Sequence, residues 1–292
     1  MVLEYLRKNV SFWVRSDVYG QKKIIFAKFL LFVYSSFVIL FLITFFILGT
    51  AIGSFLNVVI DRTTRKESIL GRSYCDHCRA NLSTFDLIPI VSFVTLGAKC
   101  RYCKKPLSWQ YPLVEALGGI LFAVAFLVLA QSGDLNLPTL FYYFFLISIA
   151  IVVAAVDFKF SLIPTSFVFL ASLVALFYDF FSFSPGIFIT YVLTAFVLAL
   201  SFALLVVATR GRGMGEGDIV LAFLIGIVLG FKATLVALFI AFLSGAVVSV
   251  VLILLGKKRF GQTIPFAPFL ILGLLSGLFW AKPILAWYLM VY

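Results

Sequence analysis

The chain has 292 residues, of which 63% are hydrophobic and only 12% are charged. Soluble domains are about half apolar and about a quarter charged, so this composition excludes an ordinary cytosolic enzyme, a disordered chain and a fibrous repeat. Lys and Arg number 23 against 12 Asp and Glu. This excess fits the basic cytoplasmic loops of a membrane protein, so we expect no nucleic-acid partner.

Apolar runs suited to crossing a bilayer recur along the chain. A helix needs roughly 20 apolar residues to span about 30 Å of hydrocarbon. The over-long first run could bend at Gly49 or Gly53, and the sixth run is short. The eight runs are Phe29–Val59, Pro112–Ala130, Leu137–Val156, Leu162–Phe183, Ile187–Ala208, Ile219–Leu229, Ala233–Leu255 and Pro265–Leu289. They predict an all-α protein, an eight-span helical bundle in contact with the lipid bilayer.

The orientation follows from the positions of the basic residues. The polar interval after the first run is rich in Lys and Arg, which places it in the cytoplasm, and later basic turns at Lys159, Arg210 and Lys257 then also fall inside. With this orientation the basic N-terminus lies outside, against the rule that basic segments stay in the cytoplasm. It could form an amphipathic helix on the membrane surface or a solvated tail. No signal peptide is expected. The predicted organisation is a basic N-terminal extension (1–28), a first span (29–60), a cytoplasmic loop domain (61–111) and a seven-span membrane domain (112–292).

All four cysteines lie in this loop, as two Cys-x-x-Cys pairs with 21 residues between them: Cys75, Cys78, Cys100 and Cys103. Such spacing is typical of a zinc site. Disulfides are disfavoured on the reducing side of the membrane, and four idle thiols are the other alternative. Because a four-sulfur site has no open coordination position, we expect structural Zn²⁺.

Acidic residues within spans are costly and are therefore functional candidates. The membrane orientation derived from the basic residues places Asp157 and Asp218 at the cytoplasmic face and Asp179 at the opposite face. Two carboxyls at one depth suit an aspartic protease, because they can share a proton while one activates water and the other protonates the substrate carbonyl. The helix ends favour Asp218 as the anion and Asp157 as the acid.

The surroundings of Asp218 leave alternatives open. Gly215 and Gly217 have no side chains, so a peptide backbone could approach this carboxylate closely; a flexible turn with Asp218 as an N-cap is the simpler explanation. A proton- or cation-coupled transporter would also use paired intramembrane aspartates. A catalytically inert scaffold whose zinc loop binds a partner is the third hypothesis.

Several short motifs, in order and spacing from Gly53 to Leu270, are similar to those of the bacterial type IV prepilin peptidases, which are GxGD-type intramembrane aspartic proteases. They are Gly53-Ser-Phe-Leu-Asn-Val-Val-Ile60 with Arg62, the two Cys pairs, Asp86-Leu-Ile-Pro-Ile90, Tyr111-Pro-Leu-Val-Glu115, Asp157 with Ile163-Pro164, Gly213-Met-Gly-Glu-Gly-Asp218, and Ile264-Pro265-Phe266 with Pro268. The resemblance implies a catalytic pair of Asp157 and Asp218. It also implies removal of basic leaders from type IV prepilins or pseudopilins at the cytoplasmic face of the bacterial inner membrane. N-methylation of the new terminus with S-adenosylmethionine is a further implied activity.

The resemblance also suggests that five residues line the substrate or cofactor site: Gly53, Asn57, Glu115, Gly215 and Gly217. The simpler explanations are close packing for Gly53, a capping amide for Asn57 and an interfacial position near Arg101 or Lys104 for Glu115. Four positions depart from the family pattern without touching the Asp pair or the cysteines: Ala98, Thr165, Val220 and Ala267. Ala98 and Val220 make methylation and substrate range less secure than cleavage.

Overall fold

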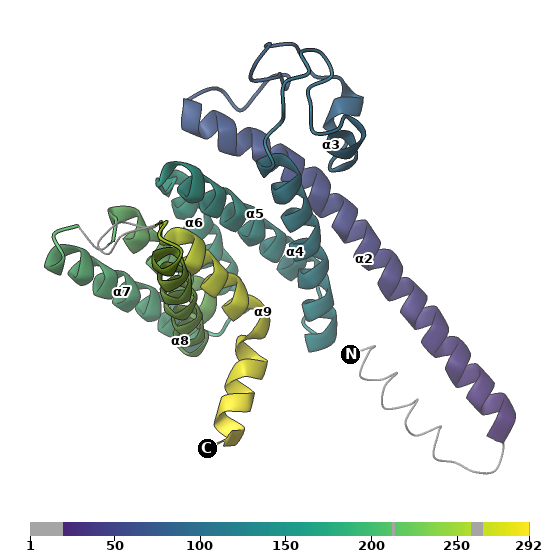
Figure 1. Cartoon of the computed structure of the whole chain (residues 1–292). Coiled ribbons are helices and arrows are strands. Elements are labelled where there is room, and N and C mark those ends of the chain that lie inside the picture. The colour runs from purple at the N-terminus through teal and green to yellow at the C-terminus, as the bar shows by residue number, and fades with distance from the viewer. Residues whose placement is uncertain (1–19, 212–213, 258–264, 292) are drawn as a thin grey trace. The chain divides into compact units, whose positions relative to one another are not determined.

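A computed structural model describes residues 20–211, 214–257 and 265–291, and its regular elements are all helical (Figure 1). The prediction of an all-α protein is confirmed. In chain order the elements are α2 (Gly20–Arg65), the 3-10 helix η1 (Thr84–Leu87), α3 (Val91–Thr95), α4 (Gln110–Ser132), α5 (Leu137–Phe160), α6 (Thr165–Ser182), α7 (Pro185–Ala208), α8 (Glu216–Leu254) and α9 (Ala267–Val291).

Seven helices within the described ranges are long and apolar enough to cross a membrane. One of them, α8, loses helical geometry at Gly230, where φ is 64° and ψ is 178°. A positive φ is accessible to glycine at little cost. This break falls in the interval predicted between the sixth and seventh spans, so α8 accounts for two of the eight predicted runs. α2, in contrast, continues through Gly49 and Gly53, where the sequence suggested a bend.

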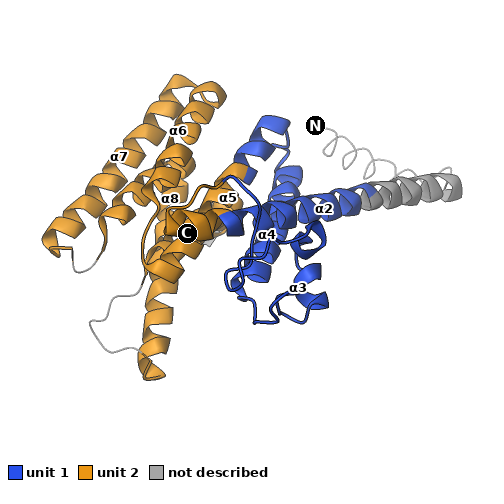
Figure 2. Ribbon diagram, turned by 90° about the horizontal axis from the view of Figure 1, so that it is seen from above, with its two compact units in different colours: residues 1–58, 70–144 blue, residues 59–69, 145–292 orange. Residues whose placement is uncertain are grey.

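The chain forms two compact units (Figure 2). Among the described residues, unit 1 comprises those up to Val58 and Leu70–Phe144, and it contains the cysteine loop and α4. Unit 2 comprises Val59–Ile69 and the described residues from Phe145 onward, and it contains α6 to α9. The predicted boundaries at residues 28, 60 and 111 stay predictions, and residues 1–19 of the basic extension lie outside the described part of the chain.

Small residues set the helix packing inside unit 1. Gly49 of α2 lies directly against the backbone of Gly118 in α4, and a Cβ on Gly53 would come within 2.7 Å of Glu115 Cα. Such small-residue crossings let two helices in a bilayer approach through their backbones. The two glycines that suggested a bend therefore form the contact between α2 and α4.

Unit 2 is built around α8, which packs against α6, α7 and α9. A Cβ on Gly226 would lie 2.5 Å from Ala195 Cα in α7, so the first segment of α8 also packs through its backbone. Its side chains there are deeply buried, as Leu221 and Ile225 show at 0% exposed. This packing fixes the start of α8, which carries Asp218.

Candidate functional site

Asp157 lies near the C-terminal end of α5 and is 5% exposed. The backbone N–H of Ala267 donates a hydrogen bond of 3.2 Å to Asp157 Oδ2. Ala267 is the first residue of α9, and the first N–H groups of a helix have no acceptor within it. The start of α9 thus supplies Asp157 with a partner 110 residues away in the sequence.

Asp218 occupies the third position of α8, and Gly215 is the N-cap residue. Gly215 N–H donates a hydrogen bond of 3.0 Å to Asp218 Oδ2. This is the carboxylate half of a capping box, so Asp218 has a local structural role, although not as the N-cap itself. The other oxygen, Oδ1, is buried and has no hydrogen-bond partner among the described residues. Capping therefore explains only one of the two carboxyl oxygens.

The structure brings these two acids together within unit 2, where their carboxyl groups are close enough to interact electrostatically. One comes from the end of α5 and the other from the start of α8. Each accepts a hydrogen bond from an N–H at the start of a helix, Asp157 from α9 and Asp218 from α8. The sequence placed Asp218 at the start of a helix, which favours the anion, and Asp157 at the end of one, which favours the acid. It could not show that Asp157 also contacts the start of α9. The assignment of acid and base therefore stays a prediction.

Asp179 lies elsewhere in unit 2. It is 1% exposed near the end of α6 and interacts electrostatically with Tyr191 of α7, whose ring lies against Gly230. Gly230 is 12 residues beyond Asp218 along α8, which corresponds to about 18 Å of helix. Asp179 is therefore associated with the far end of this segment, in agreement with its predicted separation from the pair.

Gly217 faces the segment between α5 and α6. A Cβ at Gly217 would lie 2.7 Å from Ile163 Cβ, so a larger residue could not be accommodated without a shift of the backbone. This contact explains Gly217 by packing alone. Gly213 lies outside the described residues, and the predicted role of Gly215 and Gly217 in substrate approach stays a prediction.

The four cysteine sulfurs lie within 4.8 Å of one another, and none forms a disulfide. A tetrahedral Zn²⁺ with bonds of about 2.3 Å would hold its sulfurs about 3.8 Å apart. The Sγ atoms of Cys75 and Cys103 are separated by 3.9 Å. Donor type, number and spacing therefore all fit such an ion.

Each cysteine pair sits in the same kind of backbone turn. Arg79 N–H donates to Cys75 O, and Lys104 N–H donates to Cys100 O. Arg79 and Lys104 both adopt a positive φ, 58° and 59°. Backbone hydrogen bonds, first from Cys103 and then from Tyr102, lower the pKa of the Cys100 thiol to about 7. Burial raises the pKa of the Cys75 thiol to about 11, so a metal ion bound there would have to displace the proton of that thiol.

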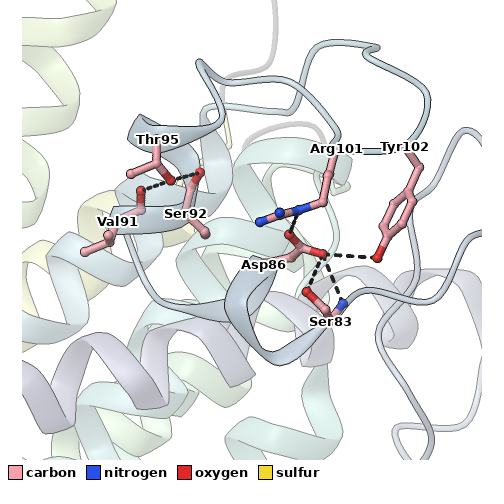
Figure 3. A network of polar contacts seen from close by, with 7 residues as sticks. All are labelled: Ser83, Asp86, Val91, Ser92, Thr95, Arg101 and Tyr102. Carbon is pink, nitrogen blue, oxygen red and sulfur yellow. Dashed lines mark hydrogen bonds and ion pairs between the residues drawn. The ribbon is translucent and has the colours of Figure 1, made fainter.

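Asp86 links the first half of the loop to the second cysteine turn (Figure 3). Its Oδ2 accepts hydrogen bonds from Ser83 N–H (3.0 Å) and Ser83 Oγ (2.8 Å), and its Oδ1 is 2.7 Å from Arg101 Nε. Burial alone would raise the pKa of Asp86, but the bonds from Ser83 and Arg101 outweigh it and hold the pKa below its ordinary value. Since Arg101 lies between Cys100 and Cys103, Asp86 supports the turn that presents these ligands.

Comparison with known proteins matches both units. The profile of the bacterial peptidase A24 N-terminal domain matches residues 47–129, and that of the type IV leader peptidase family matches residues 144–250. A Prepilin leader peptidase/N-methyltransferase of Bacillus subtilis (strain 168) is 34% identical over 249 residues, which cover 84% of this chain and 96% of the relative. The chain belongs to the type IV prepilin leader peptidase family.

Relatives with the same name in other bacteria support this membership. The protein of Aeromonas hydrophila is 30% identical over 276 residues, covering 84% of this chain and 92% of the relative. That of Burkholderia pseudomallei (strain 1026b) is 29% identical over 270 residues, covering 81% and 84%. No solved structure shows a significant match. Both acids of the pair fall within the region that matches the leader peptidase profile, and all four cysteines fall within the N-terminal one.

The remaining residues suggested by the family likeness form structural contacts in unit 1. Asn57 Nδ2 donates to Tyr111 O at 3.1 Å, which ties α2 to the start of α4. Glu115, 7% exposed, accepts a hydrogen bond of 2.7 Å from Ile90 N–H and another from the Ser54 hydroxyl. These contacts account for both side chains without a ligand, and their predicted site-lining role stays a prediction.

Sequence reasoning missed three of the contacts that position these groups. They are the bond from Ala267 to Asp157, the bond from Ile90 to Glu115, and the support of the second cysteine turn by Asp86. The motifs around them provided a signal, since Asp86–Ile90 and Pro265–Pro268 are among the stretches that resemble the family.

Proposed function

We propose that this chain is a membrane-embedded aspartic endopeptidase that removes the leader peptide from type IV prepilins or pseudopilins. The proposal follows the names of its relatives, and one structural observation carries it: the pairing of the buried acids Asp157 and Asp218. Asp218 Oδ1 is buried without a hydrogen-bond partner among the described residues. An unsatisfied buried oxygen is costly, and a water molecule held between the two acids would satisfy it.

In the proposed reaction, one carboxylate takes a proton from this water while the oxygen attacks the carbonyl carbon of the scissile peptide bond. The other carboxyl, protonated, gives its proton to the carbonyl oxygen. When the tetrahedral species collapses, the C–N bond breaks and the leaving nitrogen takes up the proton that came from water. One hydroxyl of the species returns its proton to the other carboxylate as the new C=O forms, which restores the pair. The N–H groups of Gly215 and Ala267 hold the two carboxyls in place throughout.

The charge distribution supports cleavage at the cytoplasmic face of the bacterial inner membrane. The loop that follows α2 is rich in Lys and Arg, and such loops stay inside during insertion. A prepilin presents a basic leader inside the cell and an apolar helix in the membrane, so its scissile bond lies near the inner face. With the loop inside, the end of α5 and the start of α8 lie at that face too.

We propose that Cys75, Cys78, Cys100 and Cys103 hold one Zn²⁺ whose role is structural. Four thiolates complete a tetrahedral shell and leave no position for a reacting water. The second activity, transfer of a methyl group from S-adenosylmethionine to the new terminal amine, rests on the names of the relatives alone.

The test is a cleavage assay with the purified full-length protein and a prepilin. Asp157→Asn and Asp218→Asn should each abolish the gel shift caused by leader removal, whereas the matched control Asp179→Asn should retain it. Substantial cleavage by either variant of the pair would refute the proposal. Proton or cation flux in liposomes, lost in the same two variants and without cleavage by the unaltered protein, would favour the transporter hypothesis instead.

A further inference from the structure

An exposed apolar patch on the cysteine loop lies beside the start of α4. We call Ile88, Val91, Val94 and Trp109 the interfacial patch; they are 42%, 54%, 69% and 69% exposed. In α3 the spacing of Val91 and Val94 puts them on one face of the helix. Exposed apolar clusters of this kind are unusual in water and commonly mark a binding surface.

A hydrogen bond fixes where this patch lies along α4. Ile90 N–H, immediately before α3, donates to Glu115 Oε2 at 2.7 Å. Glu115 is five residues beyond the start of α4 at Gln110, about 7.5 Å along its axis. α4 has the length and hydropathy of a membrane span. The start of α3 therefore lies beside the first turns of a membrane helix rather than out in the cytoplasm.

The rest of the local structure suits a lipid environment. Phe93 points inward at 7% exposed, and its ring packs against Trp109 with 5.0 Å between centroids. The Thr95 hydroxyl donates back to the carbonyl oxygens of Val91 and Ser92, as Figure 3 shows, so this polar group of α3 is satisfied within the helix. Tryptophan is enriched where membrane helices meet the aqueous phase, and Trp109 directly precedes α4.

We infer that the interfacial patch inserts into the cytoplasmic leaflet of the bilayer, so that the cysteine loop is attached to the membrane surface. Interfacial helices bury their apolar face about 5–10 Å into the boundary between headgroups and acyl chains, and α3 begins beside a residue about 7.5 Å along α4 from its first residue. The same loop exposes Lys99, Lys104 and Lys105, whose charges complement anionic headgroups. This inference uses the membrane orientation and not the catalytic role of the Asp pair.

The test measures contact with lipid by tryptophan fluorescence in full-length protein in nanodiscs containing anionic lipid. In a background with Trp13, Trp109, Trp280 and Trp287 changed to Phe, Val94→Trp provides a single probe in the patch. Tyr102→Trp is the control, since Tyr102 is also an exposed aromatic residue of this loop, located in the second cysteine turn. Lipids brominated near the headgroup end of their chains should quench the Val94→Trp probe and shift its emission to the blue. They should quench the control much less, because the neighbouring Lys104 and Lys105 reach only the headgroups.

Equal quenching of the two probes would overturn the inference. So would quenching of the Val94→Trp probe that disappears when a prepilin is added, because the patch would then be a substrate surface. A dependence of the signal on the ratio of protein to lipid would also overturn it, by assigning the patch to contact between copies of the chain. If Val94→Trp perturbs the loop, Val91→Trp on the same helix face should give the same quenching.

Discussion

Replacing Asp86 with asparagine should weaken the zinc binding proposed for the cysteine loop without altering a ligand. The four proposed ligands are cysteines, so the substitution changes only the group that Ser83, Arg101 and Tyr102 contact. The Asp86 side chain is 3% exposed, so solvent cannot readily replace the lost interactions, whereas that of Arg101 is 49% exposed. Asp86→Asn keeps the shape of the side chain and removes its charge.

The magnitude follows from these contacts. A half-exposed ion pair such as Arg101 with Asp86 contributes about 0.2–1 kcal/mol. Making the hydrogen bonds from Ser83 neutral costs about 1 kcal/mol more, because charge-assisted bonds are the stronger kind. The total of about 1–2 kcal/mol corresponds to a roughly 5- to 30-fold weaker site. This range overlaps the roughly 10- to 100-fold effect typical of groups that orient metal ligands.

Competition with a chelator in the purified full-length protein measures this change. The matched control is Asp134→Asn, an exposed acid in the turn between α4 and α5, which should bind zinc like the unaltered protein. In a double-mutant cycle, Asp86→Asn combined with Arg101→Gln should cost less than the sum of the single changes. Unchanged affinity in Asp86→Asn, or strict additivity in the cycle, would refute the reasoning.

Two further changes test the packing of each unit. Gly226→Ala should overpack the contact with Ala195, cost about 1–3 kcal/mol and lower the midpoint of thermal unfolding. The control Gly186→Ala has open space around its Cβ and should leave the midpoint nearly unchanged. Equal midpoints for the two variants would contradict the close crossing of α7 and α8. Glu115→Ala should leave Ile90 N–H without its acceptor, at a cost of about 1–3 kcal/mol, and Glu115→Gln should recover most of this stability. Protease cleavage of the loop measures the difference. Equal cleavage of both variants would contradict the role of the bond from Ile90 to Glu115 in holding the loop on α4.

Local chemistry made part of this structure predictable from the sequence. The spacing of the two cysteine pairs predicted a four-sulfur cluster because each pair closes its own turn, within a few residues. The end of the short sixth run predicted the break in α8. The apolar run stops just before Gly230, and glycine adopts the positive φ that the break requires. Asp157 and Asp218 could be assigned to helix ends, because hydropathy determines where each span begins and stops.

Tertiary packing decided the rest, and no local pattern encodes it. The bond from Ala267 to Asp157 joins positions 110 residues apart and depends on where α9 starts beside α5. Gly53 lies against the backbone of Glu115, a contact that only the crossing of α2 and α4 could show, and its suggested site-lining role stays a prediction. A glycine in a helix is equally compatible with close packing and with a ligand site, so the sequence left both explanations open.

The separation of the Asp157 and Asp218 carboxyl groups, measured by cryo-EM of the protein in a lipid nanodisc, tests the proposed proteolysis most directly. A shared water needs two hydrogen bonds of roughly 2.5–3.0 Å, so the nearest oxygens should lie within about 6 Å of each other. Density for one water between them is the expected result. Carboxyls at opposite faces of the membrane, or walled apart by packed side chains, would contradict the account.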